Sequence, residues 1–187
     1  MTARPELIEE FKRRFPGLAG QLGARNVEVL VGATTALELP AGRKVIRDRM
    51  PVDSLYIVLD GELTISVEEN KKAIRLGHVG PGQLLGEVSV LSGELLASST
   101  VESKTPVKLL RLRHEKFGEL IATNYDVANA LLKELVGMLA DRLRISAKSF
   151  SEHAASDAAH HVDGPGEAPA APGQNWLKSF FDRVPGT

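Results

Sequence analysis

The residues best suited to binding chemistry lie in one stretch, residues 80–101, which reads GPGQLLGEVSVLSGELLASSTV. It opens with a glycine turn and continues into a short apolar helix that is expected to begin near Glu87. Because the first N–H groups of a helix have no intrahelical partner, a helix N-terminus is suited to hold an anion. Small hydroxyl residues close the stretch. The pattern predicts a pocket for an anionic ligand, with candidate binding residues Gly86, Glu87, Val88, Ala97, Ser98, Ser99 and Thr100.

The predicted pocket has no cation of its own. A phosphate pocket is expected to place a cation near its end, where this chain has Ala97. No arginine occurs between Arg75 and Arg111. The two lysines of that interval, Lys104 and Lys108, are expected at exposed positions in or beside the last strands. A charge-assisted contact contributes about 1.5–3 kcal/mol, so its loss weakens a micromolar ligand by roughly 10- to 100-fold or more.

Each candidate residue also has an ordinary structural explanation. Glu87 is favoured at a helix N-terminus by the helix dipole alone. Ser98, Ser99 and Thr100 can be ordinary strand residues without a ligand. The glycines do not form a dinucleotide fingerprint, because the third is displaced and no long helix with a ribose-binding acid follows. On the sequence alone these alternatives stay open.

The sequence lacks the residue patterns of an enzyme or a metal protein. It has no cysteine, which excludes disulfides, thiolate catalysis and cysteine metal sites. We find no nucleophile elbow, no catalytic triad order and no phosphate-transfer loop. His153, His160 and His161 have no acidic or cysteine partners at ligand spacing, so they are expected to be solvated. We predict no catalytic activity, no metal and no cofactor.

The composition is typical of a soluble globular protein. The 187 residues are 43% hydrophobic and 25% charged, which is enough apolar material for a proper core. The net charge of −1 gives no general attraction for nucleic acid. The N-terminus, MTARPELIEEF, has no signal-peptide core, and no run approaches the roughly 18 apolar residues of a membrane span. We predict a cytoplasmic protein that neither binds nucleic acid nor spans a membrane.

The periodicity predicts a strand-rich domain between helices. Residues 1–34 carry helical patterns, residues 35–113 alternate apolar and polar side chains between glycine and proline turns, and residues 114–150 return to helical spacing. Within the strands, Leu63, Ile65 and Val67 are expected to face inward, and Thr64 and Ser66 outward. We predict an α+β fold: an antiparallel, jelly-roll-like β-roll with N-terminal helices and a long C-terminal helix, followed by a disordered tail.

The long helix carries two apolar stripes at about 100° per residue. The first consists of Leu131, Leu135 and Met138. The second, roughly 110° away, has the spacing of a coiled-coil seam and consists of Leu132, Val136, Leu139 and Leu143. One stripe can pack on the β-roll and the other needs a partner, so we predict a homodimer. A single wide arc that faces the core is the alternative.

The end of the chain differs in kind. Residues 151–174 are rich in alanine, proline and glycine and are predicted to form a disordered linker. The following segment, residues 175–184, is predicted to form a short helix whose apolar face consists of Trp176, Leu177, Phe180, Phe181 and Val184. Ten residues are too few for a stable isolated helix, so we expect it to fold on a partner protein. Docking on the chain's own β-roll or on a membrane surface are the alternatives.

The order of elements over residues 15–150 resembles the cyclic nucleotide-binding domain of catabolite activator proteins and protein kinase A regulatory subunits. The resemblance rests on three segments: LPAGRKVIRDRMPVDSLYIVLDGELTISV, GPGQLLGEVSVL and HEKFGELIATNYDVANALLKELVGMLADRL. It implies that residues 80–101 are a phosphate-binding cassette, in which Glu87 binds the ribose 2′-hydroxyl. It also implies that Ala97 stands where the family has an arginine that neutralises the cyclic phosphate.

The resemblance and the departure from it lead to one expected function. We expect a non-enzymatic regulatory or adaptor protein that is dimeric, binds ordinary cyclic nucleotides weakly or not at all, and uses residues 175–184 to bind a partner protein. A genuine sensor of a cyclic nucleotide or a related small ligand is the alternative. A transcription regulator is a third hypothesis, which the linker disfavours because it occupies the place of the family's helix-turn-helix.

Overall fold

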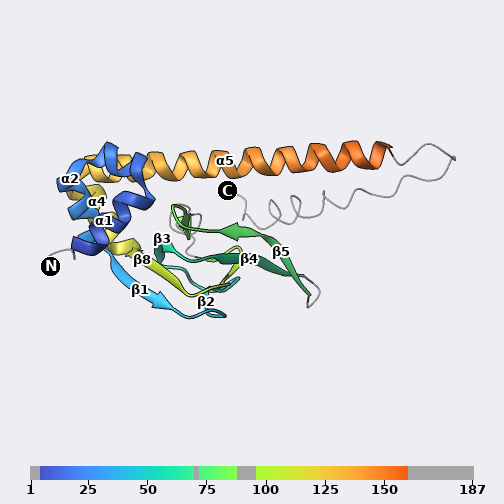
Figure 1. Ribbon diagram of the computed structural model, residues 1–187, viewed down its shortest axis with the longest axis horizontal. Coiled ribbons are helices and arrows are strands. Elements are labelled where there is room, and N and C mark those ends of the chain that lie inside the picture. Colours follow the sequence, from blue (N-terminus) through green and yellow to red (C-terminus); the bar gives the residue numbers. More distant parts are fainter. Residues whose placement is uncertain (1–4, 70–71, 88–95, 160–187) are drawn as a thin grey trace, which may run out of the picture. The chain divides into compact units, whose positions relative to one another are not determined.

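Figure 1 shows the computed structural model of the chain, which describes residues 5–69, 72–87 and 96–159. The chain divides into two compact units, Met1–Met138 and Leu139–Thr187, and each is described by itself. All the strands of the described residues belong to the first unit. The predicted interaction motif, residues 175–184, lies outside the described residues.

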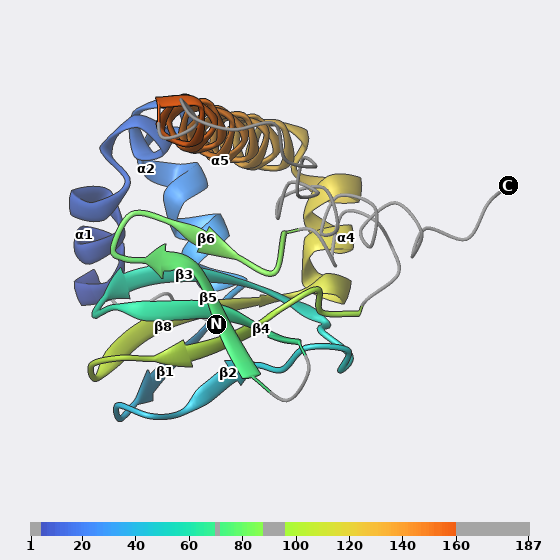
Figure 2. The ribbon, with the colours of Figure 1, turned by 90° about the vertical axis from the view of Figure 1, so that its right-hand side faces the viewer.

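The strands form two four-stranded antiparallel sheets (Figure 2). The first sheet has the order β1 (Thr35–Leu39), β8 (Val107–Arg113), β3 (Ser54–Asp60) and β6 (Leu84–Leu85). The second has the order β2 (Lys44–Ile46), β7 (Thr100–Ser103), β4 (Leu63–Glu69) and β5 (Lys72–Val79). The predicted α+β fold, an antiparallel β-roll between helices, is confirmed.

Side chains from both sheets meet in an inner core. Leu63 of β4 is fully buried there, and Ile65 packs against the same cluster, as the alternation predicts. The buried members of the inner core are Ile46, Val52, Val58, Leu63, Val79, Leu85, Ala97, Val101, Val107 and Leu109. Ala97 of the predicted pocket is thus part of the apolar interior of the roll.

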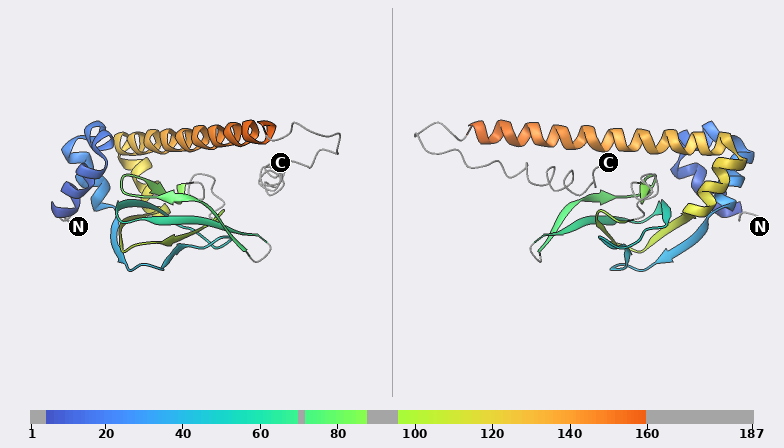
Figure 3. Two further views of the ribbon diagram at one scale, coloured as in Figure 1. Left: turned by 45° about the vertical axis from the view of Figure 1, so that its right-hand side comes forward. Right: turned by 180° about the vertical axis from the view of Figure 1, so that it is seen from behind.

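A second core joins the first sheet to the helices. Ile57 and Leu59 of β3 and Leu110 of β8 are buried there with Phe11, Leu30 and Leu131 from the helices. The neighbouring Val58 points into the inner core instead. Strand β3 is therefore covered on both faces, which accounts for its nearly uninterrupted apolar sequence, SLYIVLD. Both views of Figure 3 show the shorter helices gathered at one end of the roll.

The helices of the described residues are α1 (Pro5–Arg14), α2 (Pro16–Gly32), α4 (His114–Thr123) and α5 (Tyr125–Ala159). Helix α5 continues to Ala159, so the predicted helix end at residue 150 and linker start at residue 151 need correction. Residues 151–159, SEHAASDAA, are rich in alanine and contain no glycine or proline, and their helix propensity therefore carries the helix onward. None of the described helices combines the length and apolar character needed to span a bilayer.

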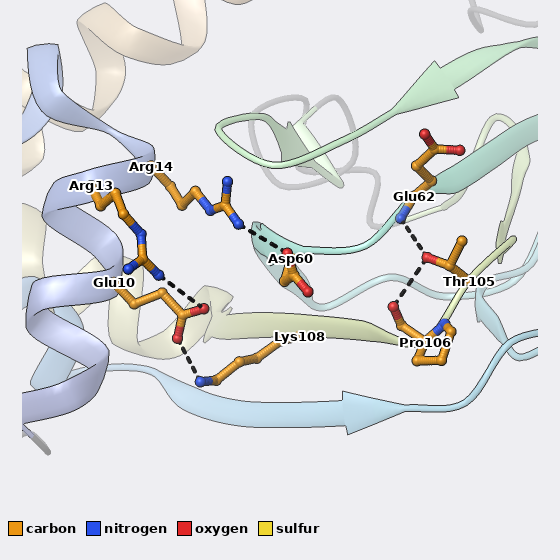
Figure 4. Close-up of polar contacts among 8 residues, drawn as sticks. All are labelled: Glu10, Arg13, Arg14, Asp60, Glu62, Thr105, Pro106 and Lys108. Carbon is orange, nitrogen blue, oxygen red and sulfur yellow. Dashed lines mark hydrogen bonds and ion pairs between the residues drawn. The ribbon is translucent and has the colours of Figure 1, made fainter.

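Ion pairs attach α1 to the first sheet (Figure 4). The Lys108 ammonium of β8 donates a hydrogen bond to the Glu10 carboxylate, which also lies 3.9 Å from an Arg13 guanidinium nitrogen. The hydrogen bond to Glu10 raises the pKa of Lys108 above its ordinary value, although desolvation opposes this. Arg14 at the end of α1 pairs with Asp60 of β3 at 2.9 Å. The end of α1 is thereby fixed beside the turn that opens the cassette.

Candidate ligand-binding site

The glycine turn that opens the cassette is fixed between β3 and α1. The Gly82 N–H donates to the Val58 carbonyl at 3.0 Å, and the Val58 N–H donates to the Gln83 carbonyl at 2.9 Å. Gly82 has a φ of 84°, and a Cβ atom there would lie 2.9 Å from the Arg14 carbonyl oxygen. Only glycine satisfies both constraints at this position without strain.

Gly86 lies against the backbone of the segment that leads into β3. Its φ is 81°, and a Cβ atom there would lie 2.5 Å from the Ser54 carbonyl oxygen and 3.5 Å from a Val52 methyl group. Glu87 follows directly and is buried, with 5% of its surface exposed. The buried Glu87 thus directly follows a glycine that packs closely on the start of β3. Val88, the next predicted site residue, lies outside the described residues.

The far end of the cassette pairs with the same segment. The Ala97 N–H donates to the Met50 carbonyl at 3.0 Å, and the Arg49 N–H donates to the Ala97 carbonyl at 2.9 Å. Leu96 forms a β-bridge with Pro51. Gly86 and Ala97, at opposite ends of the cassette, therefore both rest on residues 49–54.

The predicted hydroxyl residues separate in the structure. Ser98 is exposed, Ser99 is half-buried, and the Thr100 hydroxyl oxygen accepts a hydrogen bond from the Asp48 N–H at 3.1 Å. Thr100 therefore has a structural role in holding the loop after β2. Of the seven predicted ligand-binding residues, the structure places Glu87 and Ala97 in buried positions.

Tyr56 is a partly buried hydroxyl residue beside the start of the cassette. Tyr56 of β3 lies opposite Leu85 in the sheet register. Burial raises the pKa of the Tyr56 hydroxyl above its ordinary value, an effect that Arg111 opposes and Asp53 reinforces. The Tyr56 hydroxyl is therefore neutral at physiological pH and supplies no counter-charge to a ligand.

A pocket lined with cations lies on the outer face of the second sheet. Its volume is about 860 Å³, and its lining consists of Gly42, Arg43, Lys44, Arg47, Asp48, Arg49, Met50, Glu68 and Thr100. We call it the basic pocket. Thr100 pairs with Ser66 of β4, and the next residue, Val101, is buried in the inner core. Because successive side chains of a strand point to opposite faces, Thr100 and the pocket lie outside the roll.

The cations of the basic pocket have no role that could be predicted from the sequence pattern. The sequence does contain a local cluster of positive charge, because RKVIRDR carries four cations within residues 43–49. Their convergence with Glu68 and Thr100 depends on the pairing of β2, β7 and β4, and it cannot be read from spacing along the chain.

The predicted dimer residues differ in exposure. Val136 and Leu143 are exposed, with 63% and 71% of their surfaces accessible. Leu132 and Leu139 are half-buried, and Leu132 packs against the helical core. In the first stripe, by contrast, Leu131 and Leu135 are fully buried, and Met138 packs against the same core. Val136 and Leu143 of the second stripe are therefore not covered by the core that buries the first stripe.

Residues 36–124 match the family model of the cyclic nucleotide-binding domain. The matched range contains both sheets and the cassette described above. Over these residues the chain is similar to the cyclic nucleotide-binding domain family. This confirms the resemblance drawn from the sequence.

The chain is similar to parts of longer proteins of different kinds. Glutaminase 2 of Bradyrhizobium diazoefficiens is 28% identical over 126 residues, which make up 67% of this chain and 19% of that protein. A cyclic nucleotide-gated potassium channel of Mesorhizobium japonicum is 29% identical over 113 residues, or 60% of this chain and 30% of the channel. The chain thus spans less than a third of either relative.

A solved structure shares the fold over nearly the whole chain. It is a cyclic nucleotide-binding domain from Methylobacillus flagellatus, which aligns with a TM-score of 0.72 and 19% identity. The alignment covers 90% of each chain. At this identity the similarity establishes the fold of the cyclic nucleotide-binding domain.

Proposed function

We propose that this chain is a non-enzymatic regulatory or adaptor protein of the cytoplasm that binds cyclic AMP and cyclic GMP weakly or not at all. One observation carries the proposal: Ala97, at the position of the family's phosphate-neutralising arginine, is buried in the inner core and only 6% exposed. An apolar site of this kind disfavours a phosphate, because burying a charge without a partner is costly.

The packing around Ala97 supports this reasoning. Its neighbours in the inner core include Ile46, Val52 and Val101, none of which offers a polar group to a ligand. The cations of the basic pocket lie on the outer face of the second sheet. The apolar neighbours of Ala97 therefore supply no cation to replace the missing arginine.

Restoring the cation tests the proposal directly. We expect Ala97→Arg to strengthen cyclic AMP binding by roughly tenfold or more, because an arginine–phosphate contact contributes about that factor. Ala97→Met is the matched control, since it adds bulk to the same site without charge. Calorimetry on both variants gives the comparison. If both variants bind cyclic AMP as weakly as the parent chain, the missing arginine is not what limits binding.

The proposed protein is a homodimer joined along α5. The support is the exposure of Val136 and Leu143 on a helix whose other stripe is buried. Apolar side chains at seven-residue spacing are typical of a helix seam that a second copy covers. A dimer would present two C-terminal segments to a partner, so its avidity would exceed the affinity of a single segment.

The proposed partner contact is the aromatic segment of residues 175–184. Its support is compositional: it carries the only tryptophan of the chain and two of the six phenylalanines. We expect the fluorescence of Trp176 in the purified full-length protein to be that of a water-exposed indole, and to shift to the blue when the partner binds. A blue-shifted Trp176 in the protein alone would mean that the segment docks on its own domain.

A sensor of cyclic nucleotides is the second candidate function. The observation that favours it is the retained start of the cassette, where Gly86 keeps a close backbone approach and Glu87 is buried beside it. In the family the residue matching Glu87 binds the ribose. If residues outside the inner core supplied a cation for the phosphate, the site at Gly86 and Glu87 could bind a cyclic nucleotide.

A further inference from the structure

The four cations of the basic pocket are compensated only in part, with Glu102 opposite Lys44 in the sheet register. Within the described ranges, their only ion pair joins the Arg49 Nε atom to the Asp48 carboxylate at 4.0 Å. Glu68 is the other carboxylate of the lining. Like charges gathered on neighbouring residues repel one another, and an anion between them removes the repulsion. The basic pocket therefore keeps an excess of positive charge for an anion to neutralise.

The loop that carries Arg47 and Arg49 is held in a locally unfavourable conformation. Arg49 has a φ of 58° and is the only described residue other than glycine with a positive φ. Side chains adopt this left-handed region rarely. One carboxylate oxygen of Asp48, Oδ1, is buried and has no hydrogen-bond partner among the described residues. Backbone strain of the kind seen at Arg49 is concentrated at ligand-binding sites. The unpaired Asp48 oxygen is a hydrogen-bond acceptor and does not itself favour an anion.

Two hydrogen bonds hold this loop against the end of the cassette. The Asp48 N–H donates to the Thr100 hydroxyl oxygen at 3.1 Å, and the Arg49 N–H donates to the Ala97 carbonyl at 2.9 Å. The cation-bearing loop and the end of the cassette are therefore joined by these two hydrogen bonds. A ligand in the basic pocket would act on the same segment that a cyclic nucleotide contacts in the family.

We propose that the basic pocket binds a small polyanion of the di- or triphosphate class, such as pyrophosphate or a nucleoside diphosphate. A volume of about 860 Å³ is that of a small-molecule site. Guanidinium groups favour phosphate because their paired N–H donors match its oxygens. Asp48 and Glu68 interrupt the positive surface, so an extended nucleic acid finds no continuous basic stripe.

The test is calorimetric titration of pyrophosphate into the full-length protein at low ionic strength. We expect saturable binding, and we expect Arg47→Ala to weaken it by about tenfold or more, because a charge-assisted contact to phosphate accounts for that factor. Arg25→Ala is the matched control, since Arg25 is an exposed cation of α2 outside the pocket. It should leave the affinity within about twofold of the parent value.

A second variant separates loss of the site from loss of the fold. Arg49→Gly should raise the melting temperature, because glycine adopts a positive φ without strain. The same variant should weaken pyrophosphate binding by about tenfold. A more stable protein that binds less pyrophosphate would show that Arg49 is retained for its charge.

Three results would overturn the proposal. The first is a pyrophosphate titration that does not saturate. The second is an equal loss of affinity in Arg25→Ala and Arg47→Ala, which would indicate unspecific attraction. The third is a DNA duplex that binds more tightly than pyrophosphate. In the first case the cations only protect β2, an edge strand of the second sheet, from pairing with other chains.

Discussion

Replacing Gly86 with alanine should lower the free energy of unfolding by about 2–4 kcal/mol. A Cβ atom at this position would lie 2.5 Å from the Ser54 carbonyl oxygen. That oxygen is a backbone atom of a buried strand and cannot move aside as a flexible side chain would. The φ of 81° adds strain for any residue other than glycine.

Urea unfolding followed by circular dichroism measures this loss. Gly80→Ala is the matched control, because a Cβ atom on Gly80 meets nothing within 4 Å. Its free energy of unfolding should stay within about 0.5 kcal/mol of the parent value. If the two variants are equally stable, the cassette moves freely relative to β3, and the close approach of Gly86 does not position Glu87.

Replacing Val136 with glutamate should convert the proposed dimer to a monomer. Val136 lies in the second stripe of α5 and is 63% exposed in the single chain. In a dimer each copy would bury a carboxylate without a partner, so we expect the dissociation constant of the dimer to rise by at least about 100-fold. The fold should survive, because the exposed side chain does not contribute to either core.

Sedimentation equilibrium on the full-length protein measures the dimer. Asp141→Lys provides the control, because position 141 is exposed and lies on the other side of α5 from the second stripe. This charge change should leave the dimer intact. A parent chain that is monomeric at high micromolar concentration would contradict the dimer, and so would a Val136→Glu variant that remains dimeric.

The fold could be predicted from the sequence because its main signals are local. Alternation in β4 and helical spacing in α4 depend only on neighbouring residues. Strand β6 cannot be predicted in this way, because Leu84 and Leu85 show no alternation and their strand geometry comes from pairing with β3. The C-terminal end of α5 lies beyond the predicted residue 150, because the alanine-rich residues 151–159 are compatible with both a linker and a helix.

The site could be predicted only in part. The absence of a cation from the cassette follows from the residue types alone, and so does the candidate role of Glu87. The burial of Ala97 depends on how two sheets pack, which no spacing reveals. The basic pocket is less predictable still, because it combines a loop after β2 with residues of β4 and β7 that are distant in sequence.

Weak binding of cyclic nucleotides is the central claim, and calorimetric titration of cyclic AMP and of cyclic GMP into the full-length chain tests it most directly. Loss of one arginine–phosphate contact predicts a dissociation constant of about 10–100 μM or weaker, against about 1 μM for a site that keeps the contact. Mass spectrometry of the purified protein first establishes that no small molecule occupies the site. A dissociation constant of about 1 μM or tighter for either nucleotide would contradict the account, because another cation would then have replaced the arginine that Ala97 lacks.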